Sequence, residues 1–215
     1  IPNFMKKIEQ LALHNNNTLI TGIPTFENES ESYRNSVIVL GANTGRYDKT
    51  RLVPFGEYVP FENILRGFIR FFNLPMSNFS RGAANQPLIK IGDHLLSTAI
   101  CYEVVYPDLV ARISRGSSLL LTVSNDSWFG NSWALPQHLQ MAQMRALENG
   151  KPMLRATNNG LTGLIGWRGD LVDVLQPFRQ GELVGQVQPR IGQTPFSLLG
   201  SWPCVLLCFI ILAIL

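Results

Sequence analysis

The segment from Ser118 to Val123 is a nearly continuous apolar run, and it constrains the fold more than any other part of the sequence. A strand that is apolar on both faces is typical of a sheet with both sides covered. Helical patterns flank this run, at 107–115 and at 136–149. The alternation of buried strand and helix therefore predicts a layered α/β domain whose sheets are covered by helices.

The rest of the chain repeats this alternation. Helical spacing of apolar residues predicts further helices over 3–15 and 61–72. Short apolar runs predict strands over 19–23, 36–40, 87–91, 95–102, 153–157, 161–166, 171–175 and 183–187. Acidic residues separate the first two strands, and we interpret Glu27, Glu29 and Glu31 as a solvated loop tip.

Composition limits the class of protein. Hydrophobic residues make up 46% of the chain and charged residues 15%, whereas soluble domains carry roughly 25% charged residues. The apolar content excludes a disordered chain. The net charge of +3 is small, and it gives no reason to expect a nucleic-acid partner.

The charged residues stop at Arg190, and the run from Trp202 to Leu215 is almost wholly apolar. This run is shorter than the roughly 17 to 25 residues with which a helix spans a bilayer. Because it stops without a turn or a charge, we favour the start of a transmembrane helix over a docking helix. We therefore expect a domain over 1–190, followed by a linker and a truncated transmembrane helix over 191–215.

Cys101 is the one cysteine outside the apolar tail, where Cys204 and Cys208 are interpreted as small hydrophobic residues. It stands where a predicted strand meets a polar turn, so it is either a nucleophile or an inert strand residue. If the extended geometry persists, Glu103 faces the same side as Cys101. A carboxylate alone would raise the pKa of a thiol, so nucleophilic chemistry requires a further cationic or basic group.

The loop 46–60 offers such a group. It contains Lys49, Arg51 and Glu57 and is stiffened by two prolines. Polar side chains in a rigid loop often serve binding or catalysis. For any one of them, a surface salt bridge is the simpler interpretation, and Arg51 in particular is also consistent with a structural role.

A second polar cluster follows the next buried strand, at Asn125, Asp126 and Trp128. Two buried strands that end in polar clusters predict a functional site at that edge of the sheet. On the following helix His138 shares a face with Arg145, and we favour a hydrogen-bonded packing role for this histidine. No histidine or cysteine spacing indicates a metal site.

Four motifs in this order resemble one superfamily. They are YDKTRLVPFGEYVP at 47–60, AICYE at 99–103, SNDSWFG at 124–130 and HLQMAQMRALENGKPMLRATNNG at 138–160. Together they resemble the nitrilase, or carbon–nitrogen hydrolase, superfamily, and most closely its membrane-bound branch, the apolipoprotein N-acyltransferases. This resemblance implies an αββα sandwich without a cofactor, on the periplasmic side of a bacterial inner membrane.

The resemblance also implies residue roles. Cys101 matches the nucleophile and Lys49 the lysine of a Glu–Lys–Cys triad, while Glu57 matches a second, supporting glutamate. Tyr102 and Glu103 match residues that line the site, with the Tyr102 backbone N–H as an oxyanion donor. The implied reaction moves an acyl chain from a phospholipid, through a Cys101 thioester, to the α-amine of a diacylglyceryl-cysteine apolipoprotein.

One family feature is missing. The general-base glutamate of the superfamily stands just upstream of a stretch that resembles the start of this chain, and none of the acidic residues 27–31 matches its motif. We therefore expect the 215 residues alone to be inactive and a longer parent to be active. The alternatives are a soluble nitrilase-type amidase and a non-catalytic, membrane-tethered binding module. The segment 61–79 suits a lipid-facing lid as well as a core helix.

Overall fold

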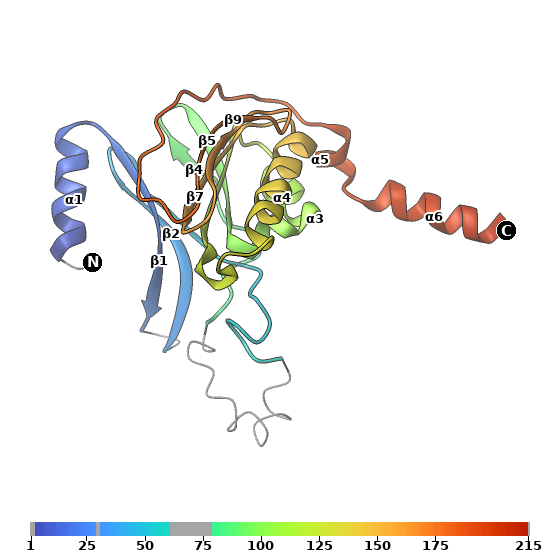
Figure 1. Cartoon of the computed structure of the whole chain (residues 1–215), viewed down its shortest axis with the longest axis horizontal. Helices are drawn as coiled ribbons and strands as arrows, with labels where there is room; N and C mark the ends of the chain where they lie inside the picture. Colours follow the sequence, from blue (N-terminus) through green and yellow to red (C-terminus); the bar gives the residue numbers. More distant parts are fainter. Residues whose placement is uncertain (1–2, 29–30, 61–78, 215) are drawn as a thin grey trace, which may run out of the picture.

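The chain forms two β-sheets with helices on their outer faces (Figure 1). The computed structural model describes residues 3–28, 31–60 and 79–214. The first sheet is antiparallel and has the strand order β1-β2-β3. Its strands are β1 (Thr18–Glu27), β2 (Ser32–Gly41) and β3 (Gly45–Asp48).

The second sheet has the order β4-β5-β6-β7-β8-β9. Its strands are β4 (Ile89–Ile91), β5 (His94–Ile100), β6 (Leu119–Asn125), β7 (Met153–Asn158), β8 (Thr162–Ile165) and β9 (Leu171–Leu175). The central strands β5, β6 and β7 are parallel, and the outer pairs are antiparallel. Helices α3 (Pro107–Ile113) and α4 (Ala134–Asn149) lie in the two crossovers between the parallel strands.

The layers are held by two apolar cores. Between the sheets, β2 and β3 contribute Val37, Val39 and Tyr47, which pack against residues of β4, β5 and β6. On the far side of the larger sheet, α4 packs Leu139, Ala142 and Ala146 onto the strands. Helix α1 (Asn3–His14) contacts the outer face of β1 and β2. The predicted layered α/β sandwich is therefore confirmed.

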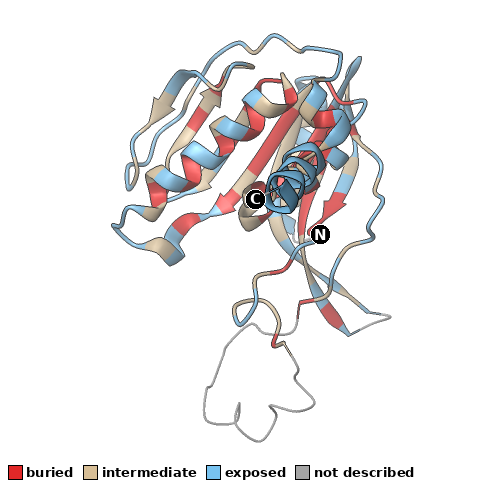
Figure 2. Ribbon diagram, turned by 90° about the vertical axis from the view of Figure 1, so that its right-hand side faces the viewer, coloured by how far each residue is buried: buried red, intermediate tan, exposed pale blue. Residues whose placement is uncertain are grey.

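The main helices also agree with their predicted ranges. Helix α4 begins two residues before the predicted start at 136 and ends at Asn149, followed by Gly150 with φ +61°. That left-handed conformation is the one glycine adopts without strain at a helix end. Many of the buried residues lie in the strands and along one face of α4 (Figure 2).

The strand predicted over 183–187 is wrong. This segment has no strand structure, and Val184 is 85% exposed. Apolar alternation alone does not make a strand, because a strand also requires a neighbour for its backbone hydrogen bonds. The nearest named strand, β9, pairs only with β8.

The interpretation of Glu27 as part of a loop tip is also wrong. Glu27 is the last residue of β1, opposite Ser32 of β2, and its carboxylate pairs with Arg34 (3.0 Å) and Arg46 (3.6 Å). Glu31 lies in the turn with φ +46°, and Glu29 is outside the described residues. The ion pairs extend the hairpin beyond the apolar part of each strand.

The apolar end of the chain forms two helices, α5 (Pro195–Leu199) and α6 (Trp202–Ile214). Helix α6 confirms that the run from Trp202 is helical, and its 13 residues include no buried one. Among the described residues, we find no helix that is both long and apolar enough to cross a membrane. The predicted helix over 61–72 and the predicted lid lie largely within 61–78, outside the described residues.

Candidate functional site

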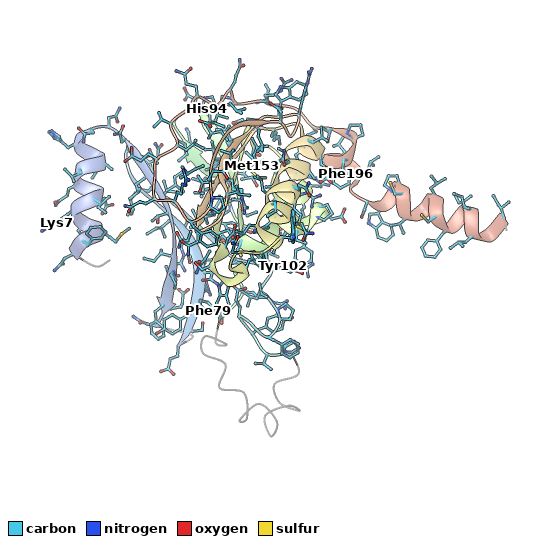
Figure 3. All side chains as sticks on the ribbon, in the orientation of Figure 1. Lys7, Phe79, His94, Tyr102, Met153 and Phe196 are labelled. Carbon is cyan, nitrogen blue, oxygen red and sulfur yellow. The ribbon has the colours of Figure 1, made fainter. Side chains whose placement is uncertain are left out.

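The parallel strands bring the predicted polar clusters together. Because β5, β6 and β7 are parallel, their carboxyl ends lie at one edge, where short helices η1 (Cys101–Val105) and η2 (Asp126–Phe129) follow. Figure 3 shows Tyr102 and Phe79 toward this end of the molecule and His94 toward the opposite end. A cavity of about 620 Å³ lies here, lined by residues of both sheets.

Four of the five predicted site residues line this cavity: Lys49, Glu57, Cys101 and Tyr102. The cavity wall also includes Asn125 and apolar side chains, among them Ile20, Ile23, Val123 and Ala156. A smaller cavity of about 170 Å³ contains none of the five predicted residues. The motifs at 47–60 and 99–103, distant in sequence, therefore meet at one concave, largely apolar site.

Cys101 does not continue the strand. Strand β5 ends at Ile100, and Cys101 begins η1 with φ +52°. Such a conformation is uncommon for a residue with a Cβ atom and clusters at functional sites when the surroundings enforce it. The prediction of a strand through 102, with Cys101 and Glu103 on one side, is therefore wrong. The turn places the half-buried Cys101 in the cavity wall.

Glu103 is fully buried and does not line the cavity, which corrects its predicted place. One carboxylate oxygen accepts hydrogen bonds from the backbone N–H groups of Thr50 (2.7 Å) and Arg51 (3.0 Å), and the other accepts from the N–H of Ile100 (2.8 Å). Glu103 thus fastens the lysine loop to the end of β5. Burial, together with the charge of Glu103, raises the pKa of the Tyr47 hydroxyl well above its usual range.

Lys49 is 1% exposed and points its ammonium at Glu57, with Nζ 2.8 Å from Oε1. The same oxygen accepts a hydrogen bond from Asn35, and the other oxygen of Glu57 accepts from the N–H of Val53 (2.7 Å). The carboxylate is therefore fully engaged. A buried ion pair with satisfied hydrogen bonds keeps the lysine cation in place.

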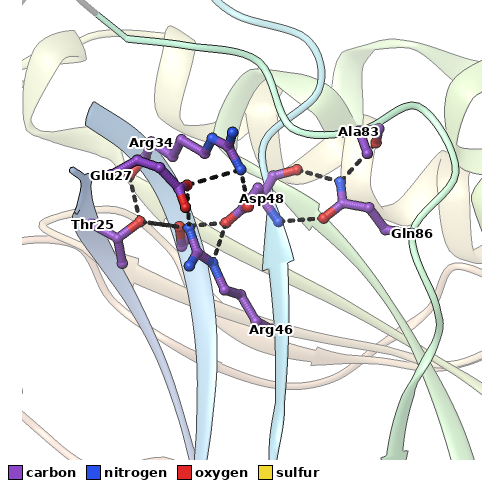
Figure 4. Close-up of polar contacts among 8 residues, drawn as sticks. Thr25, Glu27, Arg34, Arg46, Asp48, Ala83 and Gln86 are labelled. Atoms are coloured by element: carbon purple, nitrogen blue, oxygen red, sulfur yellow. Dashed lines mark hydrogen bonds and ion pairs between the residues drawn. The ribbon is translucent and has the colours of Figure 1, made fainter. Parts of the chain in front are cut away.

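Asp48 fixes the backbone just before Lys49 (Figure 4). Its Oδ1 accepts from Ser36 (2.6 Å) and from Arg46 Nε (2.7 Å), and the Gln86 side chain bonds to both the N–H and the C=O of Asp48. Burial alone would raise the pKa of Asp48, but the hydrogen bonds from Ser36 and Arg46 outweigh it and lower the pKa. The lysine therefore extends from an anchored strand end.

The second predicted cluster divides in the structure. Asn125 and Trp128 line the cavity, whereas Asp126 turns inward and is buried. The Asp126 carboxylate lies 3.1 Å from Nδ1 of His138 and 2.7 Å from Nη2 of Arg155. Burial alone would raise the pKa of Asp126, but the contacts with His138 and Arg155 lower it. The predicted hydrogen-bonded packing role of His138 is confirmed.

Sequence reasoning missed Arg155. It is fully buried in β7, between the apolar positions of a strand. The sequence does carry one signal for Arg155, which is a lone arginine inside an apolar run. A buried arginine requires a carboxylate or several carbonyl groups as partners, so this pattern indicates a buried polar contact. Here the partners are Asp126 and the carbonyl of Leu161 (3.0 Å).

Arg145 and Arg51 both brace the region after the cysteine. Arg145 donates to the carbonyls of Val104 (3.3 Å) and Val105 (3.2 Å) at the end of η1. The guanidinium of Arg51 lies over the ring of Tyr106, 5.6 Å from its centroid. Neither arginine lines the cavity. For Arg51, this contact agrees with the structural role left open by the sequence.

The cavity wall thus contains the thiol residue Cys101 and the ammonium residue Lys49 beside apolar side chains. These groups suit nucleophilic attack on a carbonyl carbon, with donors for the developing oxyanion. Within the described part of the chain, no cluster of three or more histidine, cysteine or carboxylate side chains could hold a metal ion.

Comparison with known proteins gives two kinds of match. The family model described as carbon–nitrogen hydrolase matches residues 2–196. A curated apolipoprotein N-acyltransferase of Pseudomonas aeruginosa is 50% identical over 203 residues, which are 93% of this chain and 40% of that protein. One of Azotobacter vinelandii is 45% identical and covers 98% of this chain and 41% of that protein. The chain therefore spans about two fifths of these relatives.

Solved structures show the same fold at low identity. The NitFhit protein of Caenorhabditis elegans has a TM-score of 0.63 at 18% identity, covering 82% of this chain and 43% of that one. An amidase from Nesterenkonia sp., with the acetamide moiety of fluoroacetamide on its active-site cysteine, has a TM-score of 0.56 at 22% identity. That match covers 80% of this chain and 62% of the amidase.

Proposed function

The chain belongs to the carbon–nitrogen hydrolase family, and on that premise we propose that it is the catalytic part of an apolipoprotein N-acyltransferase. The acyl donor is a phospholipid and the acceptor is an apolipoprotein with a diacylglyceryl-modified N-terminal cysteine. The observation that carries this proposal is one cavity shared by Cys101 and the Lys49–Glu57 pair. Relatives of that name at 50% identity support the choice of reaction.

In the first half-reaction, the thiolate of Cys101 attacks the ester carbonyl carbon of the phospholipid. A C–S bond forms, and the carbonyl electrons move to oxygen. The ammonium of Lys49 and the backbone N–H of Tyr102 stabilise this oxyanion, and removal of one such donor typically costs about 10²- to 10³-fold in rate. The intermediate then expels the lysophospholipid alkoxide, which takes up a proton, and leaves a Cys101 thioester.

In the second half-reaction, the α-amine of the lipoprotein cysteine attacks the thioester carbonyl. A C–N bond forms and the C–S bond breaks, so the Cys101 thiolate is restored and the amine loses a proton. Glu57 is suited to hold the Lys49 side chain in place in both halves. The sequence of two substrates on one nucleophile is a ping-pong mechanism.

The thiol also requires a general base. Among the described residues that line the cavity, Glu57 is the sole carboxylate, and both of its oxygens already accept hydrogen bonds. We therefore propose that a second carboxylate, from residues upstream of this chain, removes the proton of Cys101. On this proposal the 215 residues alone are inactive toward phospholipid at neutral pH.

Exposed apolar groups favour a lipid substrate over a small amide. Helix α6 exposes its side chains, and Trp128, which is 72% exposed, stands at the cavity wall. Exposed apolar side chains along a whole helix, as in α6, are typical of contact with a membrane or another apolar partner. We accordingly place the enzyme at the periplasmic face of a bacterial inner membrane, with α6 entering or lying on the bilayer.

The test uses the complete protein with its upstream residues, incubated with a phospholipid that carries a labelled palmitoyl chain. We expect a hydroxylamine-sensitive acyl-enzyme that is lost in Cys101→Ala and retained in Cys204→Ala. An equal acyl-enzyme in Cys101→Ala would refute the nucleophile. Release of ammonia from small amides without detergent would instead favour the amidase, and the absence of both reactions would favour a binding module.

A further inference from the structure

His138 contacts the backbone of the proposed nucleophile. Its Nε2 lies 3.3 Å from the carbonyl oxygen of Cys101, although the two residues are 37 positions apart. The imidazole is 4% exposed and belongs to α4, which packs against η1. Since a carbonyl oxygen only accepts, Nε2 must carry the proton and donate it.

The other ring nitrogen is satisfied in either protonation state. Nδ1 lies 3.1 Å from Nη2 of Arg155 and 3.1 Å from Oδ1 of Asp126. A neutral ring accepts from Arg155 through Nδ1, whereas a protonated ring donates from Nδ1 to Asp126. In both states Nε2 carries a proton and donates a hydrogen bond to the carbonyl oxygen of Cys101. The pair Asp126–Arg155 thus fixes the orientation of the ring.

The carbonyl of Cys101 and the N–H of Tyr102 belong to the same peptide group. In a planar trans peptide these two bonds point in opposite directions, and the described residues include no cis peptide. Tyr102 is the second residue of η1, where the backbone N–H has no acceptor within the helix. Holding the carbonyl on the side of α4 therefore aims the N–H of Tyr102 away from α4, and Tyr102 lines the cavity.

We propose that His138 is a positioning residue, which holds the Cys101–Tyr102 peptide so that its N–H faces the oxyanion of the acyl intermediate. The inference rests on the proposed role of Cys101 as the nucleophile. It adds a function for the buried group His138–Asp126–Arg155, none of which lines the cavity. The left-handed conformation of Cys101 is the strained feature that this contact maintains.

Two reactions of the Cys101 thiol distinguish a change in the position of the Tyr102 N–H from a change in the reactivity of the thiol itself. Acylation by p-nitrophenyl butyrate passes through an oxyanion, whereas alkylation by iodoacetamide does not. Both rates are measured on the 215-residue chain in detergent at about pH 9.5, above the usual cysteine pKa of about 8.5, so that no general base is required. Cys204 and Cys208 are exposed and are replaced by alanine, so that Cys101 alone reports.

Two matched variants of His138 differ in how far the side-chain amide reaches toward the Cys101 carbonyl. Asparagine keeps a polar atom near the position of Nδ1 but does not reach the Cys101 carbonyl, and glutamine carries an N–H near the position of Nε2. We expect His138→Asn to lower the ratio of acylation to alkylation about tenfold, a part of the loss seen when a donor is removed outright. We expect His138→Gln to stay within about threefold of the unsubstituted chain.

The control is Asn149→Ala, at the far end of α4. Asn149 is buried, accepts from Ser114 Oγ (2.8 Å) and donates to the carbonyl of Arg145 (2.8 Å), so its loss destabilises the helix contacts without touching Cys101. An unchanged ratio in His138→Asn, or an equal fall in His138→Gln and Asn149→Ala, would overturn the positioning role. If the unsubstituted chain is alkylated but not acylated at Cys101, the proposed nucleophilic function fails instead.

Discussion

Helices α4 and α6 depart from the usual distribution of polar and apolar residues in opposite ways. Helix α4 buries His138, Arg145 and Asn149 within the domain. Helix α6 exposes Leu207, Phe209 and Ile211 to the outside, and none of its residues is buried. The first helix lies beside the candidate site, and the second leads away from the domain (Figure 1).

The difference separates the two parts of the proposed activity. Buried polar groups are tolerated only where hydrogen bonds replace water, so the polar side chains of α4 mark an arrangement that holds the backbone of η1 in one geometry. Exposed apolar groups gain by contact with another apolar phase, so on the proposed function α6 is the element that contacts the membrane. Catalytic geometry and membrane contact are thus assigned to separate helices.

The largest effect is expected where the buried group His138–Asp126–Arg155 loses its arginine cation. Arg155→Leu leaves the Asp126 carboxylate buried without its charge partner. Removing one member of a buried ion pair typically costs about 3–5 kcal/mol of unfolding free energy. Urea unfolding measures this loss.

The control for that variant is Glu27→Ala, because the Glu27–Arg34 pair is more exposed. Exposed pairs contribute about 0–1 kcal/mol. Equal losses of stability in Arg155→Leu and Glu27→Ala would contradict the view that the group around His138 is a structural centre.

A smaller loss is expected from Gly160→Ala. A Cβ atom at position 160 would come too close to Oδ2 of Asp126, the oxygen that pairs with Arg155, and lie 2.8 Å from Asp126 Cβ, so the carboxylate would have to shift. Overpacking of this kind costs about 1–3 kcal/mol. Gly45→Ala, whose nearest neighbour is a flexible side-chain atom of Ile89 at 3.4 Å, is the control for unfolding in urea.

A still smaller effect is expected from acid. The pKa of Asp126 is lower in the folded protein than in the unfolded chain, where it is about 3.9. The stability that this group contributes is therefore fully present above about pH 4 and lost as the pH falls through the folded value. Unfolding free energies measured from neutral pH down to the acid range should fall less steeply in Asp126→Asn. A steeper fall in that variant would contradict a lowered pKa of Asp126 in the folded protein.

The smallest effect on stability, and a clear effect on binding, is expected in α6. Leu207→Asp changes an exposed residue, so the unfolding free energy should change by no more than about 0.5 kcal/mol. Binding to phospholipid vesicles, measured by sedimentation, should weaken about tenfold, because the transfer of a carboxylate into an apolar phase is unfavourable. Val184→Asp, at an exposed position outside α6, should leave vesicle binding unchanged. Equal binding by both variants would remove the membrane role of α6.

Much of the fold could be predicted from local sequence. Helix α4 has a proline near its start and a glycine at its end, and both signals act within a few residues. The convergence of Cys101 and Asp126 at one sheet edge followed from two buried strands with polar ends. Local signals of this kind do not depend on the rest of the chain.

The remaining features depend on contacts across long separations. Glu103 bonds to Thr50, 53 residues away, and this contact turns the chain after β5 where a strand was extrapolated. Arg155 pairs with Asp126 across 29 residues. A single sequence contains no record of such partners, so the buried carboxylate was predicted to line the cavity and the buried arginine was missed.

The most direct test of the account asks which of the three thiols becomes acylated. The 215-residue chain is treated in detergent with p-nitrophenyl butyrate at about pH 9.5, digested, and examined by peptide mass spectrometry at early times. We expect a hydroxylamine-sensitive butyryl group on the peptide that contains Cys101, formed well before any label on Cys204 or Cys208, although those two thiols are the more exposed. Labelling of Cys204 or Cys208 ahead of Cys101 would contradict it.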